Sequence, residues 1–240
     1  MIKTAIVTGA STGIGRAVAI ELAEEYFVYL VARREDKLQE TKRIIEENGG
    51  MGEILLCDLS DKTSLHKLVE TIRSKTDSVE MLMNIAGIWH GENEVFTETN
   101  YDMFTESVIY DTVNVGLIAP MVLSHGIIPL MKNGGIIVNL SGTFENGAKG
   151  WLPYYVSKRA LEDFTIGLSQ DLQGRDIKVI GISPSDVATE EYQKYFPEDA
   201  KDALLPKEVA SQIVKIVKAS QSGKVWVLKR GMEPKVDFHY

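Results

Sequence analysis

The sequence predicts a single α/β domain built on a doubly wound, mostly parallel sheet of about seven strands flanked by helices. Short apolar runs alternate with longer stretches of helical periodicity along the whole chain, which is the pattern of repeated strand–helix–strand units. Several runs are rich in Val and Ile on both faces, as in the strands of a buried parallel sheet. With 240 residues, 44% of them hydrophobic, the chain can bury one large core, so we expect residues 1–240 to form one domain.

The expected strands and helices alternate in order. The apolar runs predict strands at residues 4–8, 27–32, 53–57, 81–85, 135–140, 178–182 and 224–228. Helical periodicity predicts helices at residues 14–25, 36–48, 64–76, 101–131, 156–173 and 207–220. Glycine pairs after Asn48 and Asn133 mark the ends of the second and fourth helices. In such sheets ligands bind beyond the carboxyl ends of the strands, where we therefore expect the functional residues.

Composition excludes several classes of function. A formal net charge of -8 gives no general attraction to nucleic acid or to anionic lipid. No apolar run approaches the roughly 18 to 20 residues of a membrane helix, and the first residues lack a signal-peptide pattern, so we expect a cytoplasmic protein. Cys57 is the only cysteine and has apolar neighbours, which predicts a buried packing position. His66, His125 and His239 lie without partners at ligand spacing, so we expect no metal site.

A glycine-rich loop follows the first strand and leads into a helix. Its sequence, TGASTGIG, occupies residues 8–15. Glycine lets a pyrophosphate approach the main chain, and the free N–H groups at the start of a helix favour negative charge. The loop therefore predicts a dinucleotide site, although a tight strand-to-helix turn alone would also explain the glycines.

The spacing TGxxxGxG resembles that of the short-chain dehydrogenase/reductase family, which has a Rossmann-type fold. The resemblance implies a cofactor site in the loop formed by Gly9, Ser11, Thr12, Gly13, Ile14 and Gly15. It further implies contacts from Asp58 and Leu59 after the third strand, with the acid against the adenine ring. Asn84, Ala86 and Gly87 stand where the family usually has NNAG, and Ile85 replaces its second Asn.

The end of the second strand bears on the choice between NAD(H) and NADP(H). NAD enzymes usually have an acid there that binds both ribose hydroxyls, whereas this strand ends in Ala32-Arg33-Arg34. We expect Arg33 to bind the 2′-phosphate of NADP(H), since its planar fork suits phosphate oxygens, and Arg34 to stack on the adenine. A solvated basic pair balanced by Glu35 and Asp36 is the alternative. The prediction is that NADP(H) is preferred, while NAD(H) stays open.

Tyr154 and Lys158 form a YxxxK pair that lies on one face of a helix. A phenol with a reference pKa of ~10 is a poor base at neutral pH, but a nearby ammonium and an oxidised nicotinamide stabilise its phenolate. Tyr154 can then give a proton to a carbonyl oxygen or take one from an alcohol. Lys158 selects Tyr154 over the adjacent Tyr155, and a surface Tyr–Lys pair is the alternative.

Two further residues match the family's catalytic set. Ser141 ends the apolar run at 136–140 and precedes Tyr154 by 13 residues, a separation typical of the family. The resemblance implies that its hydroxyl holds the substrate oxygen. Asn114 matches the family's Asn on the long helix, which holds a water that relays protons from the Lys. A capping serine and a satisfied core amide are the alternatives for these two positions.

The segment after the sixth strand, SPSDVAT at residues 183–189, stands where the family has PG followed by Val or Ile and a Thr. The resemblance implies cofactor contacts from Pro184, Val187 and Thr189, the last two beside the nicotinamide carboxamide. Ser185 replaces the usual glycine, so the local backbone is less free. The loop residues expected to border a partly apolar substrate are Trp89, His90, Glu145, Trp151, Tyr192, Tyr195 and Phe196.

These patterns together predict an NADP(H)-dependent oxidoreductase that interconverts a carbonyl and an alcohol, with Asn114, Ser141, Tyr154 and Lys158 as its catalytic residues. A 3-oxoacyl-thioester reductase or a sugar or steroid dehydrogenase would use the same machinery. The alternative from another class is a catalytically silent NADP(H)-binding regulatory protein or redox sensor. The resemblance also implies a homodimer or homotetramer that acts on a small molecule. From the net charge and the lack of a long apolar run, we expect no nucleic-acid or membrane partner.

Overall fold

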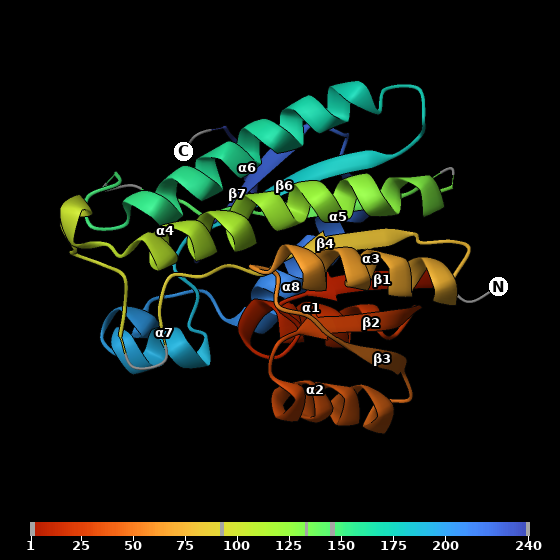
Figure 1. Cartoon of the computed structure of the whole chain (residues 1–240), viewed down its shortest axis with the longest axis horizontal. Coiled ribbons are helices and arrows are strands. Elements are labelled where there is room, and N and C mark those ends of the chain that lie inside the picture. Colours follow the sequence, from red (N-terminus) through yellow and green to blue (C-terminus); the bar gives the residue numbers. More distant parts are fainter. Residues whose placement is uncertain (1–2, 92–93, 133, 145–146, 239–240) are drawn as a thin grey trace.

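The structure, a computed structural model, describes residues 3–91, 94–132, 134–144 and 147–238. Within these residues one sheet has the strand order β3-β2-β1-β4-β5-β6-β7-β8 (Figure 1). The strands are β1 Lys3–Thr8, β2 Tyr26–Ala32, β3 Met51–Leu56, β4 Met81–Asn84, β5 Ile136–Leu140, β6 Lys178–Pro184, β7 Lys224–Leu228 and β8 Lys235–Val236. Strands β1 to β7 pair in parallel, which confirms the predicted doubly wound sheet. The two-residue β8 pairs antiparallel with β7 and is too short to give a pattern in the sequence.

The strand order reverses beside β1. From β1 the chain builds outward through β2 and β3, then returns to add β4 on the other side of β1. The loops after β1 and β4 therefore diverge at the carboxyl ends of these strands, and a crevice forms between them. The predicted functional residues lie at this end of the central strands.

Two layers of helices cover the sheet (Figure 1). The helices are α1 Gly13–Leu22, α2 Glu35–Glu47, α3 Lys62–Lys75, α4 Glu106–Val113, α5 Ala119–Ile127, α6 Leu152–Asp171, α7 Glu190–Tyr195 and α8 Pro206–Ala219. One apolar core packs α1, α2 and α8 against one face of the sheet, and a second core packs α3 and α5 against the other. Both faces of the central strands are therefore buried, as their continuous apolar runs predicted. Cys57 is buried in the second core, as its neighbours predicted.

The helix predicted at 101–131 is interrupted at its functional residue. A 3-10 turn, η1 Tyr101–Met103, precedes α4, and a π-helical turn, η2 Asn114–Ile118, separates α4 from α5. The Cβ of any residue other than glycine at 116 would lie 2.6 Å from the Ser157 Oγ, so this segment approaches α6 closely. Such single π turns are frequent at functional sites.

The stretch Glu106–Leu130 is long and apolar enough to cross a membrane, with a mean hydropathy of 1.6 over its most apolar window. Polar residues interrupt this stretch, so the sequence contains no uninterrupted apolar run of this length. Half of that window is buried inside the protein, where α5 packs on the second core. A core helix passes the same test of length and composition.

Helix α7 was not predicted from the sequence. This helix has six residues, and Thr189 begins it by accepting a hydrogen bond from the backbone N–H of Tyr192 at 3.2 Å. A Thr followed by two Glu residues was a helix-start signal, but the segment is too short to show apolar periodicity. The helix matters because it borders the site described next.

Candidate active site

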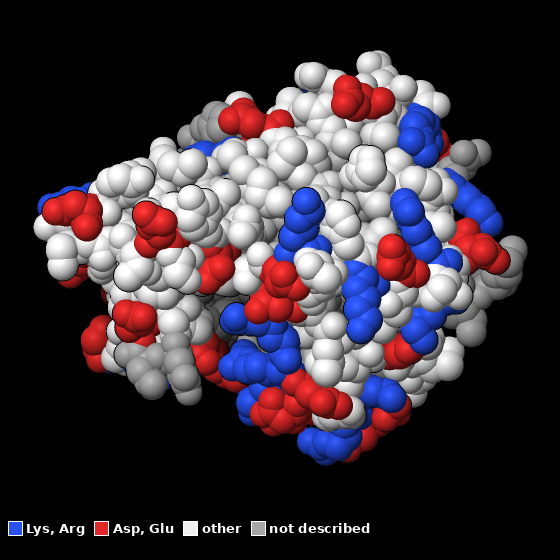
Figure 2. Space-filling view, in the orientation of Figure 1, with Lys and Arg blue, Asp and Glu red and all other residues white. Residues whose placement is uncertain are grey.

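A cavity of about 600 Å³ opens at the carboxyl ends of the central strands. The space-filling view shows this face hollowed beside the α7 segment, with basic side chains along one border of the hollow (Figure 2). Most predicted site residues line the cavity, namely Gly9, Ser11, Thr12, Gly13, Ile14, Gly15, Arg33, Arg34, Asp58, Leu59, Ala86, Gly87, Tyr154, Lys158 and Thr189. Asn84, Asn114, Ser141, Pro184 and Val187 lie around it, outside this lining.

The glycine loop has no room for side chains at its turning point. A Cβ on Gly15 would lie 2.1 Å from the backbone oxygen of Gly9, so the first turn of α1 packs directly on the end of β1. Gly9 and Gly13 have φ values of +70° and +56°, which side chains other than glycine rarely tolerate. Thr12 precedes α1, and its side chain makes no capping hydrogen bond, so it does not occupy the N–H groups of the first helical turn. The residues present fit a pyrophosphate.

The loop after β4 keeps its shape despite the replacement at Ile85. The Thr8 hydroxyl accepts hydrogen bonds from the backbone N–H groups of Ile85 at 3.0 Å and Ala86 at 3.2 Å, while the Ile85 side chain packs in the first core. Asn84 donates to Asn139 at 2.9 Å and is buried behind the cavity wall. In the neighbouring loop Asp58 Oδ1 accepts from the backbone and hydroxyl of Ser60 at 3.0 and 2.8 Å, which fixes the acid at the cavity border.

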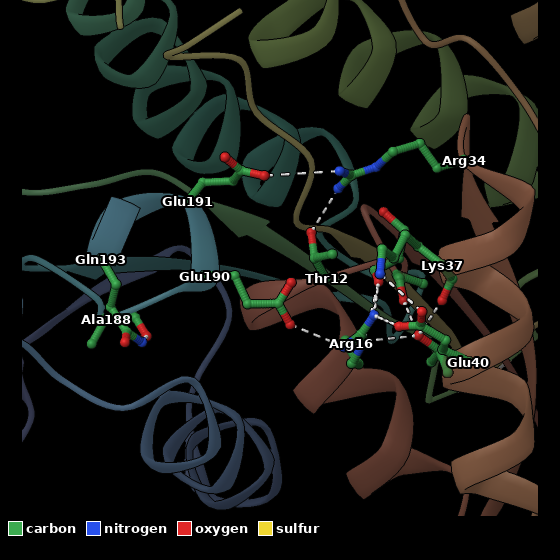
Figure 3. Close-up of polar contacts among 12 residues, drawn as sticks. Thr12, Arg16, Arg34, Lys37, Glu40, Ala188, Glu190, Glu191 and Gln193 are labelled. Carbon is green, nitrogen blue, oxygen red and sulfur yellow. Dashed lines mark hydrogen bonds and ion pairs between the residues drawn. The ribbon is translucent and has the colours of Figure 1, made fainter. Parts of the chain in front are cut away.

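Arg33 and Arg34 both line the cavity, and among the residues that the structure describes only Arg34 has polar side-chain contacts there. Its guanidinium donates to the Thr12 hydroxyl at 3.1 Å and lies 3.9 Å from the Glu191 carboxylate of α7 (Figure 3). Arg33, like Arg34, is exposed and lies just after the end of β2, but no ion pair or hydrogen bond of its side chain is found among the described residues. The structure thus gives the two arginines different surroundings, which their adjacent places in the sequence did not distinguish.

Arg16 directly follows the glycine loop and was not among the predicted site residues. Its guanidinium donates to the Ser11 carbonyl at 2.6 Å and pairs with Glu40 of α2 at 3.0 Å (Figure 3). It also pairs with Glu190 at 3.1 Å, so α7 is connected to the loop on two sides, through Arg16 and through Arg34. A cation directly after GIG was the available signal, but the partners come from distant parts of the chain.

Tyr154 and Lys158 lie one helical turn apart on α6, as their spacing predicted. Lys158 is 1% exposed, its Nζ donates to the Leu140 carbonyl at 2.7 Å, and it lies 5.4 Å from the Tyr154 ring centroid. Burial lowers the pKa of Lys158 to about 8, and the Glu162 carboxylate opposes this decrease. Burial raises the pKa of Tyr154, so its phenol is protonated at neutral pH.

Ser141 lies at the end of β5, and its hydroxyl turns toward α6. Its Oγ donates to Glu162 Oε1 at 2.7 Å and lies 3.3 Å from the Ile182 carbonyl oxygen. The other oxygen of Glu162 accepts from Arg159 at 3.0 Å. Glu162 is 1% exposed. Its role was not predictable, because one Glu on an amphipathic helix gives no sign of burial.

The remaining predicted residues lie around the cavity. Asn114 begins the π turn and donates to the Ser60 carbonyl at 3.3 Å. Val187 is buried and bridges to Leu204. The Pro184 carbonyl accepts from the backbone of Thr143 at 3.0 Å. Thr189 caps α7 and lies against Gly13.

An aromatic cluster extends from the cavity, whose lining includes Trp89 and His90 of this cluster. Trp89 lies within 6.4 Å, between ring centroids, of each of the other members, which are His90, Trp151, Tyr192, Tyr195 and Phe196. Trp151 also lies 6.3 Å from Tyr154. The structure therefore brings together aromatic residues from three separate segments that the sequence singled out, with Tyr192 and Tyr195 on α7 and not in a loop. Glu145, the acidic residue expected beside them, lies outside the described residues.

Comparison with known proteins gives the family. The family model described as short chain dehydrogenase matches residues 3–200, which is most of the chain. The chain belongs to the short-chain dehydrogenase family. It is 32% identical over 225 residues to a fatty acyl-CoA reductase of Acinetobacter baylyi, covering 88% of this chain and 72% of that one.

Two further relatives of this short-chain dehydrogenase are informative. It is 28% identical to an NADP-dependent 3-hydroxy acid dehydrogenase of Schizosaccharomyces pombe, covering 88% of this chain and 85% of the other. A crystal structure of a short chain dehydrogenase from Burkholderia cenocepacia in complex with NADP superposes with a TM-score of 0.85 at 26% identity, covering 95% and 97% of the two chains. The family and the Rossmann-type fold predicted from the motifs are thereby confirmed.

Proposed function

We propose that this chain is an NADP(H)-dependent oxidoreductase that interconverts a carbonyl and an alcohol by hydride transfer, with Tyr154 as the general acid and base. The observation that carries the proposal is the pairing of Tyr154 with buried Lys158 in the wall of a cavity that also includes the glycine loop. The proposed proton donor and the proposed dinucleotide-binding loop therefore line the same cavity. This combination serves no packing purpose, because burying Lys158 costs free energy.

The cofactor would lie with its pyrophosphate on the glycine loop, where Gly9, Gly13 and Gly15 leave only backbone. A bound nicotinamide supplies or accepts the hydride. Asp58 borders the adenine end, and Lys158 can donate to the nicotinamide ribose hydroxyls. Asn114, Val187 and Thr189 keep the roles that the family resemblance implies.

At neutral pH the Tyr154 phenol is protonated, so in carbonyl reduction it begins as the proton donor. Its raised pKa keeps the phenol neutral, so during reduction it can donate the proton to a carbonyl oxygen as negative charge develops there. The Lys158 ammonium, 5.4 Å from the ring centroid, then stabilises the phenolate that remains. In the reverse direction the same pair takes the proton of an alcohol. Ser141 remains the sequence prediction for the hydroxyl that holds the oxygen, and it would have to leave Glu162 to do so.

The preference for NADP(H) rests on the arginines. No acid ends β2, and both Arg33 and Arg34 line the cavity within reach of a phosphate placed after that strand. The NADP complex of the Burkholderia protein and the name of the Schizosaccharomyces relative support this preference.

The aromatic cluster around Trp89 favours a carbonyl substrate with an apolar portion. A 3-oxoacyl thioester or a steroid has such a portion, and the Acinetobacter relative is named for acting on a fatty acyl thioester. A sugar would make poorer use of these rings, so we place it last.

We also propose a cytoplasmic homo-oligomer. Apolar side chains are exposed on three neighbouring elements, including Tyr110 on α4, Met121 on α5 and Val156 on α6, at 64%, 41% and 49%. A second copy of the chain would cover this face. Size-exclusion chromatography with light scattering measures the stoichiometry, and Tyr110→Glu should convert a dimer to a monomer.

The proposed activity is tested by the absorbance of reduced nicotinamide with NADPH and a panel of ketones, aldehydes and diones. Tyr154→Phe should lower kcat by roughly 100-fold or more, because the proton donor is lost. Tyr155→Phe is the matched control and should stay near the native rate, since its ring packs on Phe144 and Arg159. Equal turnover by Tyr154→Phe and native protein would contradict the mechanism. Tight NADPH binding without turnover would favour the regulatory alternative.

A further inference from the structure

The hydroxyl of Ser141 is committed to a buried carboxylate. It donates to Glu162 at 2.7 Å, and the two side chains are 4% and 1% exposed. A hydrogen bond from a hydroxyl to a carboxylate is among the strong ones, and breaking it would leave a buried charge with one partner fewer. Ser141 is therefore poorly placed to donate a hydrogen bond to a substrate in the cavity.

Hydrogen bonds from the β5 segment to α6 show which residue of this segment comes next along α6 in the direction of Tyr154. Asn139 donates to Thr165 at 3.0 Å, and two residues along the strand Ser141 donates to Glu162, three residues back along the helix. Two strand residues span ~6.6 Å and three to four helix residues span ~5 Å, so the two elements advance in step. The next strand position on this face, Thr143, then faces the turn of α6 that contains Lys158.

The backbone keeps its extended form over this step. The N–H of Ser141 donates to the Ile182 carbonyl at 2.7 Å, and the N–H of Thr143 donates to the Pro184 carbonyl at 3.0 Å. Alternate residues of an extended chain share a face, so Thr143 lies on the same side as Ser141, and Gly142 between them has no side chain. Thr143 is only partly buried, unlike Ser141.

The residue after Thr143 shows that this segment lies at the catalytic pair. The Phe144 ring lies 5.8 Å from the Tyr154 ring, and the Arg159 guanidinium lies 5.4 Å from the Phe144 ring. Residues 143 and 144 are therefore beside the turn of α6 from Tyr154 to Arg159.

We propose that Thr143, and not Ser141, is the catalytic residue whose hydroxyl holds the substrate oxygen, while Ser141 and Glu162 are positioning residues that fix the end of β5 on α6. This rests on the proposed function. In reduction, the hydride adds to the carbonyl carbon and the π electron pair moves to the oxygen. That oxygen takes the Tyr154 proton, and the Thr143 hydroxyl donates a hydrogen bond to it and keeps its own proton.

The test compares matched variants in the carbonyl-reduction assay. Thr143→Val keeps the shape of the side chain and removes its hydroxyl, and should lower kcat by about 100-fold while NADPH affinity stays unchanged. Thr143→Ser restores the hydroxyl and should recover most of the rate. Ser141→Ala should lower the melting temperature, because Glu162 loses a partner, and should lower kcat much less than Thr143→Val does.

The role of Thr143 and the proposed oxidoreductase activity can fail separately. Turnover by native protein together with a native kcat for Thr143→Val would overturn the role of Thr143 alone. Loss of kcat in a folded Ser141→Ala protein, with Thr143→Val near native, would return the role to Ser141. Where Ser141→Ala does not fold, the Thr143 variants still decide. Absence of any turnover by native protein would overturn both proposals.

Discussion

The Lys158 ammonium donates a hydrogen bond of 2.7 Å to the carbonyl of Leu140, which joins the helix that contains Tyr154 to the last residue of β5. The lysine is thus held in place by the strand that also precedes Ser141 and Thr143. Burial lowers the pKa of Lys158 to about 8, so its charge is present at neutral pH and is lost within the accessible range. The hydrogen bond to Leu140 therefore holds the Lys158 side chain in place, while its charge depends on pH.

Carbonyl reduction should therefore lose rate as the pH rises through about 8. Below this pKa Lys158 is protonated and stabilises the phenolate left by Tyr154, and above it the neutral amine does so poorly. The measurement is kcat/KM with NADPH from about pH 6 to about pH 10. A flat profile across this range would show that the Lys158 charge is not needed.

Glu162→Gln should move that loss of rate to lower pH. The carboxylate raises the pKa of Lys158 against the effect of burial, so removing its charge lowers that pKa. Gln can still accept the hydrogen bond from Ser141, which separates the electrostatic effect from the packing effect. Asp163→Asn, at the exposed neighbouring position, is the control and should leave the profile in place. A shift of the glutamine variant toward higher pH would refute the argument.

Arg33→Ala should weaken NADPH binding by roughly 10-fold to 100-fold, the equivalent of one charge-assisted hydrogen bond, and leave NADH binding within about twofold. The physical reason is that only NADPH has the 2′-phosphate that the guanidinium would bind. Fluorescence titration of both nucleotides measures this. Unchanged NADPH affinity would contradict the role of Arg33, and the preference for NADP(H) would then rest on Arg34.

Glu191→Gln should strengthen NADPH binding by about twofold to fivefold. The Glu191 carboxylate lies 3.9 Å from the Arg34 guanidinium and competes with a phosphate for it (Figure 3). Its charge also repels the phosphate directly. Glu198→Gln is the control, because Glu198 follows α7 and pairs with Lys201, not with an arginine of the cavity. It should change NADPH affinity little. Weaker NADPH binding by Glu191→Gln would mean that the α7 contact supports the cofactor site.

Gly15→Ala should abolish NADPH binding and lower the free energy of unfolding by about 2 kcal/mol or more, because the added Cβ meets the Gly9 backbone oxygen. The contact distance of 2.1 Å leaves no room for local adjustment. Gly167→Ala in α6 is the matched control, since nothing lies within 4 Å of its added Cβ. Alanine there should stabilise the helix by about 0.5–1 kcal/mol. Chemical denaturation compares the two, and equal stability would contradict the packing argument.

The sequence predicted the central architecture because its signals are local. Apolar runs in β1, β4 and β5 mark strands buried on both faces, and the glycine spacing at residues 9–15 marks a turn that only glycine can form. The i,i+4 spacing of Tyr154 and Lys158 placed both on one face of α6 without knowledge of the fold. These features depend on neighbouring residues, so they can be recognised in a single sequence.

Elements that depend on distant partners were not predictable in this way. Strand β8 exists because β7 offers it an edge, and α7 is fixed by Arg16 and Arg34 from the other end of the chain. The predicted helix at 101–131 contains a π turn at Asn114, where α6 approaches the glycine at 116. The start signal at Thr189 did not reveal the arginines that pair with α7, and the close approach of α6 gives no local pattern in the sequence.

By itself, then, the sequence determined the sheet, the dinucleotide loop, and the pairing of Tyr154 with Lys158, because backbone geometry and short spacing control all three. The tertiary structure decided the surroundings of each hydroxyl and charge. It directed Ser141 to Glu162, buried Lys158 beside Leu140, and gave Arg34 an acidic neighbour that Arg33 lacks among the described residues. Hydrogen-bond partners and burial are set by chain segments far apart in sequence, and only the folded chain brings these together.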